Sequence, residues 1–112
     1  NAKLELEKAQ LEYNSILNIT KNIIYTNYDK FMMAQENVGY YQNIIGESKK
    51  ILNLSKQLYK KGQISITNLI VVEHSHQELL NEYLAAIGVY YNAYISLLTE
   101  LGMENLSVDI DL

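Results

Sequence analysis

Apolar side chains recur every three or four residues along most of this chain, which is the spacing of helices that bury one face. The pattern is clearest in residues 64–101, where two apolar stripes run side by side. The first stripe contains Ile66, Ile70, Leu80, Leu84, Ile87, Tyr91, Tyr94, Leu98 and Leu101. The second contains Leu69, Val72, His76, Leu79, Tyr83, Ala86, Tyr90, Ala93 and Leu97. They lie about 100° apart around a helix. Because a two-stranded coiled coil needs only one stripe, two stripes indicate a helix packed on both flanks, as in a bundle or a closed ring.

The earlier residues repeat this spacing with more polar interruptions. Their stripes are Leu6, Ala9, Tyr13, Ile16, Thr20 and Ile23; Leu17, Ile24, Tyr28, Phe31 and Val38; and Tyr41, Ile44, Ser48, Ile51, Ser55 and Leu58. We interpret the period as resetting at Gly39, Gly62 and Gly102, since glycine is the only strong helix breaker in the chain. The sequence therefore predicts an all-α fold with helices over residues 1–37, 41–60 and 65–101, a turn at 38–41, a break at 61–64 and a tail at 102–112.

The break around Gly62 has a physical basis in the residues on each side of it. Lys60 and Lys61 put cations in the last turn of one helix, next to its negative end. Gly62 can adopt the left-handed conformation that ends a helix. Ser65 or Thr67 can then cap the helix that follows.

Composition narrows the range of functions. The chain has 112 residues, 48% of them hydrophobic, with no Pro and no Cys. The missing Pro favours long helices, and the missing Cys excludes disulfides and thiolate metal sites. All nine cations are Lys and the net charge is −4, which argues against nucleic-acid binding. No apolar stretch is long enough to span a bilayer as a helix.

Charge is segregated along the chain. The net charge is −1 over residues 1–38, +4 over residues 39–62 and −7 over residues 63–112. If the second and third predicted helices fold back on each other, these blocks attract. The same pattern equally fits a solvated face on each helix.

The residues offer no catalytic or metal-binding constellation. His74 and His76 are two residues apart, so a helix directs them about 160° apart and they cannot share one metal ion. His76 lies in an apolar stripe, where the favoured interpretation is a hydrogen-bonded, partly buried side chain. His74 and Glu78 are ordinary one-turn neighbours. Phosphate-binding loops, nucleophile elbows and zinc pairs are also missing, so we expect no enzyme activity, no cofactor and no metal.

One segment carries a family resemblance. The run Leu58-Tyr-Lys-Lys-Gly-Gln-Ile-Ser65 resembles the Tyr-x-x-Gly-x-(Ile/Val)-(Ser/Ala) element of TolC-like outer membrane efflux proteins. In that family a long helix follows, with a repeating Leu, Ala and Tyr pattern, and it closes on Leu-x-x-x-x-Gly. Here Tyr90, Tyr94 and the run Leu97–Gly102 match that order. The resemblance covers residues 58–102 and extends more weakly back to about residue 4.

The resemblance implies a part of a homotrimeric channel, as a long antiparallel helical hairpin in a periplasmic α-barrel below the outer membrane. Such hairpins meet a periplasmic adaptor protein at their tips and an inner-membrane pump indirectly. Counting back from Gly62, as the family pattern implies, puts the adaptor-contacting tip at Asn37, Val38, Gly39 and Tyr40. Tyr59 and Gly62 would then mark a helix break in the tunnel wall.

Two interpretations stay open. The chain lacks the internal repeat and the barrel strands of the family, so under the first it is the last part of the second repeat of a longer channel protein, exporting small molecules or metal ions. Under the second it is an autonomous helical-bundle module that binds a partner helix or itself. We expect the first to self-associate and the second to melt cooperatively as a monomer.

Overall fold

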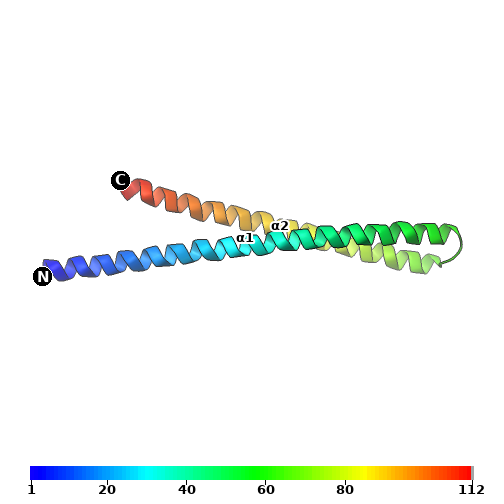
Figure 1. The fold of residues 1–112 in the computed structure, drawn as a ribbon, viewed down its shortest axis with the longest axis horizontal. Helices are drawn as coiled ribbons and strands as arrows, with labels where there is room; N and C mark the ends of the chain where they lie inside the picture. The colour runs from blue at the N-terminus through cyan, green and yellow to red at the C-terminus, as the bar shows by residue number, and fades with distance from the viewer. Residues whose placement is uncertain (112) are drawn as a thin grey trace. The chain divides into compact units, whose positions relative to one another are not determined.

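Two helices account for almost all of the protein. The structure is a computed structural model that describes the backbone of residues 1–111 and the side chains of residues 1–102. Helix α1 spans Ala2–Lys60 and helix α2 spans Ile66–Asp111, as Figure 1 shows. Over these described residues there is no strand, so the predicted all-α class is confirmed.

The connection between α1 and α2 forms as the sequence predicts. Gly62 adopts a φ of 72°, in the left-handed region that favours glycine. Its N–H donates to the Tyr59 carbonyl at 2.9 Å, and the Gln63 N–H donates to the Leu58 carbonyl at 2.9 Å. These two bonds make a Schellman motif, which satisfies carbonyls at the end of α1. The Ser65 hydroxyl accepts the Asn68 N–H at 3.1 Å, so Ser65 is the cap of α2.

The turn predicted at residues 38–41 is wrong, because α1 runs through these residues without a break. Most of its less exposed positions follow one another in steps of three and four residues, with no reset at Gly39. They are Leu17, Thr20, Ile24, Asn27, Phe31, Ala34, Val38, Tyr41, Ile45, Ser48, Leu52, Ser55 and Leu58. A glycine inside a helix costs only about 1 kcal/mol relative to alanine, and one continuous packing face outweighs that cost. Gly39 therefore weakens the helix locally but does not end it.

The predicted helix end at Gly102 is also wrong. Helix α2 continues to Asp111, and the only glycine with positive φ over the described backbone is Gly62. Without a left-handed residue or a proline, nothing at Gly102 stops the backbone ladder. The predicted tail at 102–112 is thus helical up to Asp111, and Leu112 lies outside the described residues.

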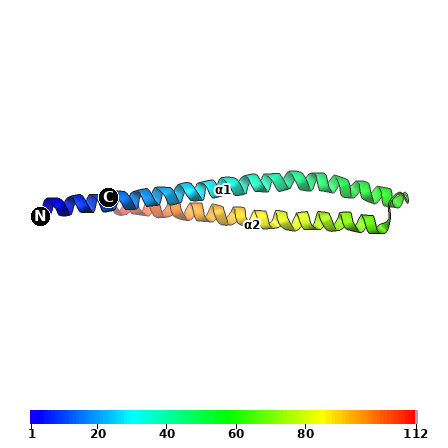
Figure 2. The ribbon, with the colours of Figure 1, turned by 90° about the horizontal axis from the view of Figure 1, so that it is seen from below.

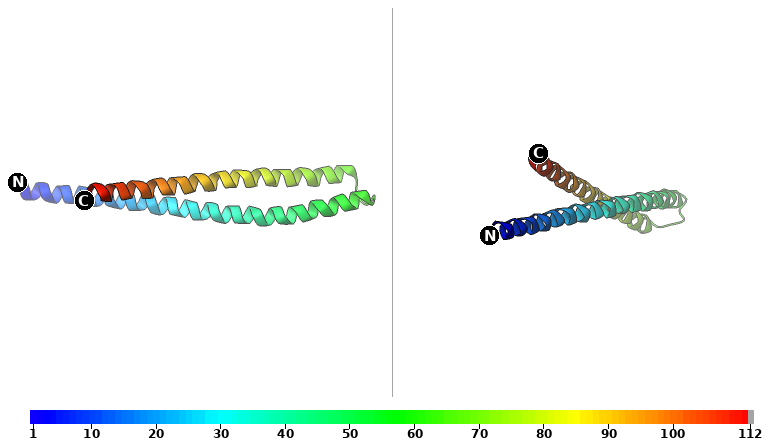
Figure 3. Two further views of the ribbon diagram at one scale, coloured as in Figure 1. Left: turned by 90° about the horizontal axis from the view of Figure 1, so that it is seen from above. Right: turned by 60° about the vertical axis from the view of Figure 1, so that its left-hand side comes forward.

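The chain divides into two compact units. The unit that contains the turn comprises residues 33–91 and is an antiparallel helical hairpin, with its two helical segments side by side in Figures 2 and 3. Its buried residues are Ala34, Ser55, Leu69 and Ala86. The other unit comprises residues 1–32 and 92–112, where the Phe31 and Tyr94 rings pack with centroids 5.8 Å apart. The hairpin unit carries the residues that the sequence singles out.

Candidate functional site

The four residues predicted to form a partner-binding tip lie on different faces of α1 instead. Val38 is half-buried and belongs to the packing face toward α2. Asn37 is exposed, and Tyr40 is 60% exposed with its ring against Tyr41, their centroids 5.6 Å apart. A Cβ added at Gly39 would meet nothing within 4 Å. The structure therefore gathers these residues along a helix and not at the end of a hairpin.

The end of the hairpin is the turn around Gly62. Tyr59 lies in the last turn of α1 and is 42% exposed. Lys56, Lys60 and Lys61 are exposed around it, and no acidic residue occurs between Glu47 and Glu73. The first turn of α2 carries no acidic residue either. The turn is consequently a cationic, solvent-facing end with one exposed aromatic ring.

Polar side chains tie the two helices of the hairpin together. Ser48 Oγ on α1 and His76 Nδ1 on α2 are 2.8 Å apart and partly buried, as expected for a histidine within an apolar stripe. Gln42 Nε2 donates to Tyr83 Oη at 3.3 Å. These contacts fix the register of the hairpin, because each polar pair forms only when its two residues stand at the same height.

Tyr41 belongs to the same set of contacts. Partial burial raises the pKa of the Tyr41 phenol above its ordinary value of 10.0, and the negative charge of Glu82 raises it further. The phenol also hydrogen-bonds the Glu82 carboxylate. Because the proton of this bond belongs to the phenol, ionisation of Tyr41 breaks it.

Each helix of the hairpin also carries apolar residues on a second face. On α1 we call this the α1 outer stripe, and its apolar members are Met33, Tyr40, Ile44, Ile51 and Leu54. On α2 we call it the α2 outer stripe, and its apolar members are Ile66, Ile70, Leu80, Leu84, Ile87 and Tyr91. Met33 is 69% exposed and Leu84 is 64% exposed, whereas Ile44, Leu80 and Ile87 are half-buried. The α2 outer stripe is one of the two stripes predicted from the sequence, and the other packs inside the hairpin.

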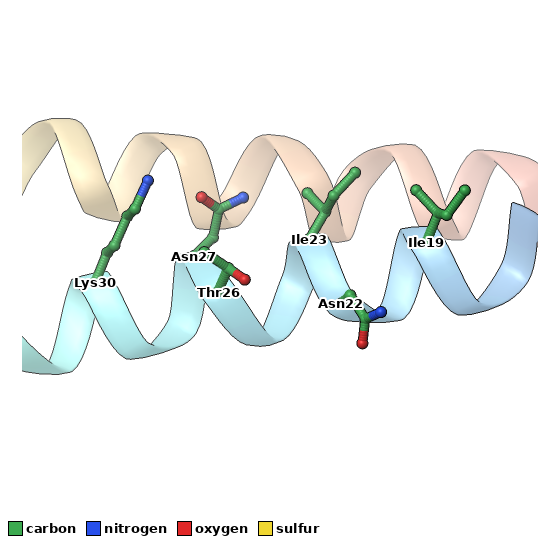
Figure 4. Close-up of a pocket in the computed structure, with 6 residues that line it drawn as sticks. All are labelled: Ile19, Asn22, Ile23, Thr26, Asn27 and Lys30. Atoms are coloured by element: carbon green, nitrogen blue, oxygen red, sulfur yellow. The ribbon is translucent and has the colours of Figure 1, made fainter.

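In the unit that contains residues 1–32, a shallow groove runs along α1. It is lined by Ile19, Asn22, Ile23, Thr26, Asn27 and Lys30, and Figure 4 shows Ile19, Ile23, Asn27 and Lys30 pointing to the same side of the helix. Ile19 and Ile23 follow the helical spacing of a second face, with exposed fractions of 56% and 42%. This mixed lining has few charges, one lysine among six residues, and suits a packed side chain better than a charged ligand.

Neither metal binding nor membrane spanning is indicated over the described residues. They contain no group of three or more His, Cys, Asp or Glu side chains that could hold a metal ion. Within the same residues, no helix combines the length and the hydrophobicity needed to cross a bilayer. His74 Nε2 lies 3.0 Å from a Glu78 carboxylate oxygen, both side chains being exposed, which is the one-turn pairing that the sequence predicts.

Comparisons with known proteins give no relatives from which a function can be transferred. The chain matches no protein-family model, no curated protein and no solved structure. The function therefore has to be argued from the hairpin and from its sequence.

Sequence reasoning missed the continuity of the inner face of α1. Ala34 is 6% exposed and lies in the middle of that face, yet its small side chain gives no apolar signal. Asn27 and Ser48 are polar members of the same face. Counting steps of three and four from Leu17 through Val38 to Tyr41, without a reset at Gly39, recovers the face. The spacing was therefore present in the sequence, and the residue types concealed it.

Proposed function

We propose that this chain is a wall element of a TolC-like outer membrane efflux channel, in its periplasmic α-barrel. In this role the helices line a path for small molecules or metal ions and perform no chemistry. The functional partners are a periplasmic adaptor protein, an inner-membrane pump that acts through it, and the other protomers of a homotrimer.

The observation that carries the proposal is a two-helix hairpin whose outer stripes are apolar, with most of their members exposed. Every helix in the wall of a closed tunnel needs a neighbour on each side, so it needs two apolar faces. Val71 and Ile95, which lie off both stripes, are 58% exposed, so isolated apolar residues occur elsewhere on α2. The outer stripes differ from these because their residues follow helical spacing along the whole hairpin. The resemblance over residues 58–102 supplies the family.

The end of the hairpin is the natural place for the adaptor in this proposal. Asn37–Tyr40 lie within the unbroken α1 and not at an end of the hairpin. The turn around Gly62 is the part of the hairpin that an adaptor approaching along the tunnel axis meets first. Tyr59, Lys60 and Lys61 are exposed there and are the residues that we propose to contact it.

The gene provides the direct test. Sequencing the DNA on both sides of the coding segment should reveal a second copy of the Tyr-x-x-Gly element and segments of alternating strands. Flanking DNA that encodes neither the second Tyr-x-x-Gly element nor alternating strands would contradict the channel proposal.

Adaptor binding tests the placement of the contact. The chain should bind the periplasmic adaptors of TolC-like pumps, measured by biolayer interferometry on immobilised chain. Charge reversal at the turn, by Lys60→Glu with Lys61→Glu, should abolish the signal. Lys49→Glu with Lys50→Glu makes the same change in charge inside α1 and should leave it. Equal losses from both pairs would mean that net charge, and not the turn, governs binding.

A second candidate function is an autonomous helical interaction module. This function is favoured by the hydrogen bonding of the buried polar atoms. Among the described residues, every buried side-chain N or O atom has a hydrogen-bond partner. A module of this kind should melt as a monomer at a temperature independent of protein concentration, with coincident transitions by circular dichroism and tyrosine fluorescence. A wall element should instead melt at a temperature that rises with concentration.

A further inference from the structure

All five lysines of the hairpin unit lie in its turn half, residues 48–72, and that segment contains no acidic residue. The acidic residues of the unit lie outside the segment, at Glu36, Glu47, Glu73, Glu78 and Glu82. We propose that one side of the turn half, formed by a row of lysines on α1 and exposed isoleucines on α2, binds the surface of an anionic phospholipid bilayer. The inference concerns the chain by itself and goes beyond the efflux proposal, on which it does not depend.

The lysines and the isoleucines project to the same side of the hairpin. Lys49 comes one residue after Ser48 of the inner face of α1, and Lys56 repeats that position seven residues later. Ile70 comes one residue after the buried Leu69 of α2. One residue is a rotation of about 100° around a helix. Because the two helices are antiparallel, this equal rotation away from their interface turns both sets of side chains toward one side of the hairpin.

The part of α1 on this side is cationic along its turn half. Lys49, Lys56 and Lys60 follow one another at spacings of seven and four residues, in a row about 16 Å long. All three are exposed, and no ion pair involves them among the described side chains. The other α1 residues of the hairpin unit on this side are polar or glycine, namely Gln35, Gly39, Gln42, Gly46 and Asn53. The row therefore presents its positive charge to solvent.

The part of α2 beside this row is apolar. Ile66 and Ile70 are 48% and 55% exposed. Ser48 stands opposite His76, so six residues forward on α1 and six back on α2 place Ile70 level with residue 54, within the length of the lysine row. Glu73, one turn beyond Ile70, is the first acidic residue on this side of α2 and marks the end of the surface. We call this surface the basic side, with the residues Lys49, Lys56, Lys60, Ile66 and Ile70.

The chemistry of the basic side fits a lipid surface. Apolar side chains can enter the boundary between headgroups and acyl chains, while lysines extend their stems and keep their ammonium groups at the phosphates. Lysine is a point charge on a flexible stem, which suits a field of phosphates better than one carboxylate held in a fixed geometry. The opposite side of the hairpin carries Glu47, Glu78 and Glu82, which repel anionic headgroups. The hairpin can therefore dock on such a surface by one side only.

Cosedimentation with vesicles tests the proposal. The full chain should bind vesicles of equal parts phosphatidylglycerol and phosphatidylcholine at least about tenfold more tightly than vesicles of phosphatidylcholine alone. Binding to the anionic vesicles should weaken as salt is raised from about 0.05 to 0.5 M, because salt screens the lysines. No binding to the anionic vesicles, or equal binding to both kinds, would refute the proposal. Either result would leave the gene-based test of the efflux proposal unaffected.

Removing two lysines of the row tests the cationic part. Lys49→Gln with Lys56→Gln should weaken binding to the anionic vesicles by about 25-fold, at about fivefold per lysine. Lys8→Gln with Lys21→Gln makes the same change in net charge in the other unit of the chain and should weaken it by less than about twofold. Equal losses from the two pairs would mean that net charge, and not the basic side, governs binding. Lys60 and Lys61, the lysines assigned to the adaptor, stay in place in both pairs.

Two neighbouring residues test the apolar part. Ile70 is 55% exposed on the basic side, and Val71 is 58% exposed on the opposite side. Ile70→Ser should weaken binding to the anionic vesicles by about 5- to 10-fold, and Val71→Ser should leave it nearly unchanged, with both variants equally helical by circular dichroism. Equal losses would overturn the assigned side. If the lysine pair mattered and Ile70→Ser did not, the row would bind anions without entering a bilayer, as on an acidic protein surface, and the lipid proposal would be wrong.

Discussion

Ser48 Oγ and His76 Nδ1 lie 2.8 Å apart across the interface between α1 and α2. Ser48 comes from the lysine-rich part of the chain and His76 from the acidic part, and this hydrogen bond joins the two parts. No salt bridge joins α1 to α2 over the described side chains, since Lys50 and His74 each pair within their own helix. The lysine-rich and acidic segments thus lie in one hairpin without an ion pair between them among the described side chains.

Removing both partners of this bond should destabilise the hairpin by less than the sum of the two single removals. Ser48→Ala and His76→Leu are each expected to lower the free energy of unfolding by about 1–2 kcal/mol, because the remaining partner is left without its hydrogen bond. The double variant should lose less than the sum, with a coupling of about 0.5–1.5 kcal/mol. Urea denaturation at one fixed protein concentration measures all four chains. His74→Leu, at an exposed position, is the control and should change stability by less than about 0.5 kcal/mol. Strictly additive losses would mean that the bond contributes nothing.

The start of α2 depends on Ser65. Its hydroxyl accepts the Asn68 N–H, so Ser65→Ala should lower the free energy of unfolding by about 1 kcal/mol. Thr67 has no hydrogen bond of this kind and lies inside the helix, so Thr67→Ala should be neutral or slightly stabilising. Thermal unfolding followed by circular dichroism distinguishes the two variants. A larger loss of stability from Thr67→Ala than from Ser65→Ala would mean that Ser65 is not the residue that caps α2.

The sequence predicted the features that depend on local chemistry. Gly62, the lysines before it and the cap after it specify the turn, and the structure has the turn at that place. The inner stripe of α2, from Leu69 to Leu97, was also predicted residue by residue. The continuity of α1 was not predicted. Its packing face contains Ala34, Asn27 and Ser48, which a count of large apolar residues does not include. The candidate tip at Asn37–Tyr40 failed for the same reason, since a glycine was given more weight than the period around it.

Tyr41 makes stability depend on alkaline pH. Its pKa is raised in the folded chain, so the neutral phenol is favoured there, and the stabilisation is fully present below the ordinary pKa of 10.0. As pH rises through the raised pKa, the phenol ionises beside Glu82 and that stabilisation is lost. The difference in unfolding free energy between the natural chain and Tyr41→Phe should therefore be constant at neutral pH and shrink above about pH 10.

Tyrosinate absorbance during an alkaline titration assigns the group. Of the ten Tyr residues, the one lost in Tyr41→Phe should titrate above the ordinary value for a phenol. Glu82→Gln removes the neighbouring charge and should bring that titration down. A Tyr41 titration that Glu82→Gln leaves unchanged would mean that burial alone raises the pKa.

Two glycines of the same helix-and-turn segment should respond oppositely to the same substitution. Gly62 has a φ of 72°, which an L side chain adopts at a cost of about 1 kcal/mol, so Gly62→Ala should destabilise the hairpin by roughly that amount. Gly39 is helical, and an added Cβ meets nothing within 4 Å, so Gly39→Ala should stabilise it by about 0.5–1 kcal/mol. Urea denaturation of both variants at one protein concentration gives the two signs. If Gly39→Ala destabilised the chain, residues 38–41 would form a turn after all, and the hairpin would have to end there and not at Gly62.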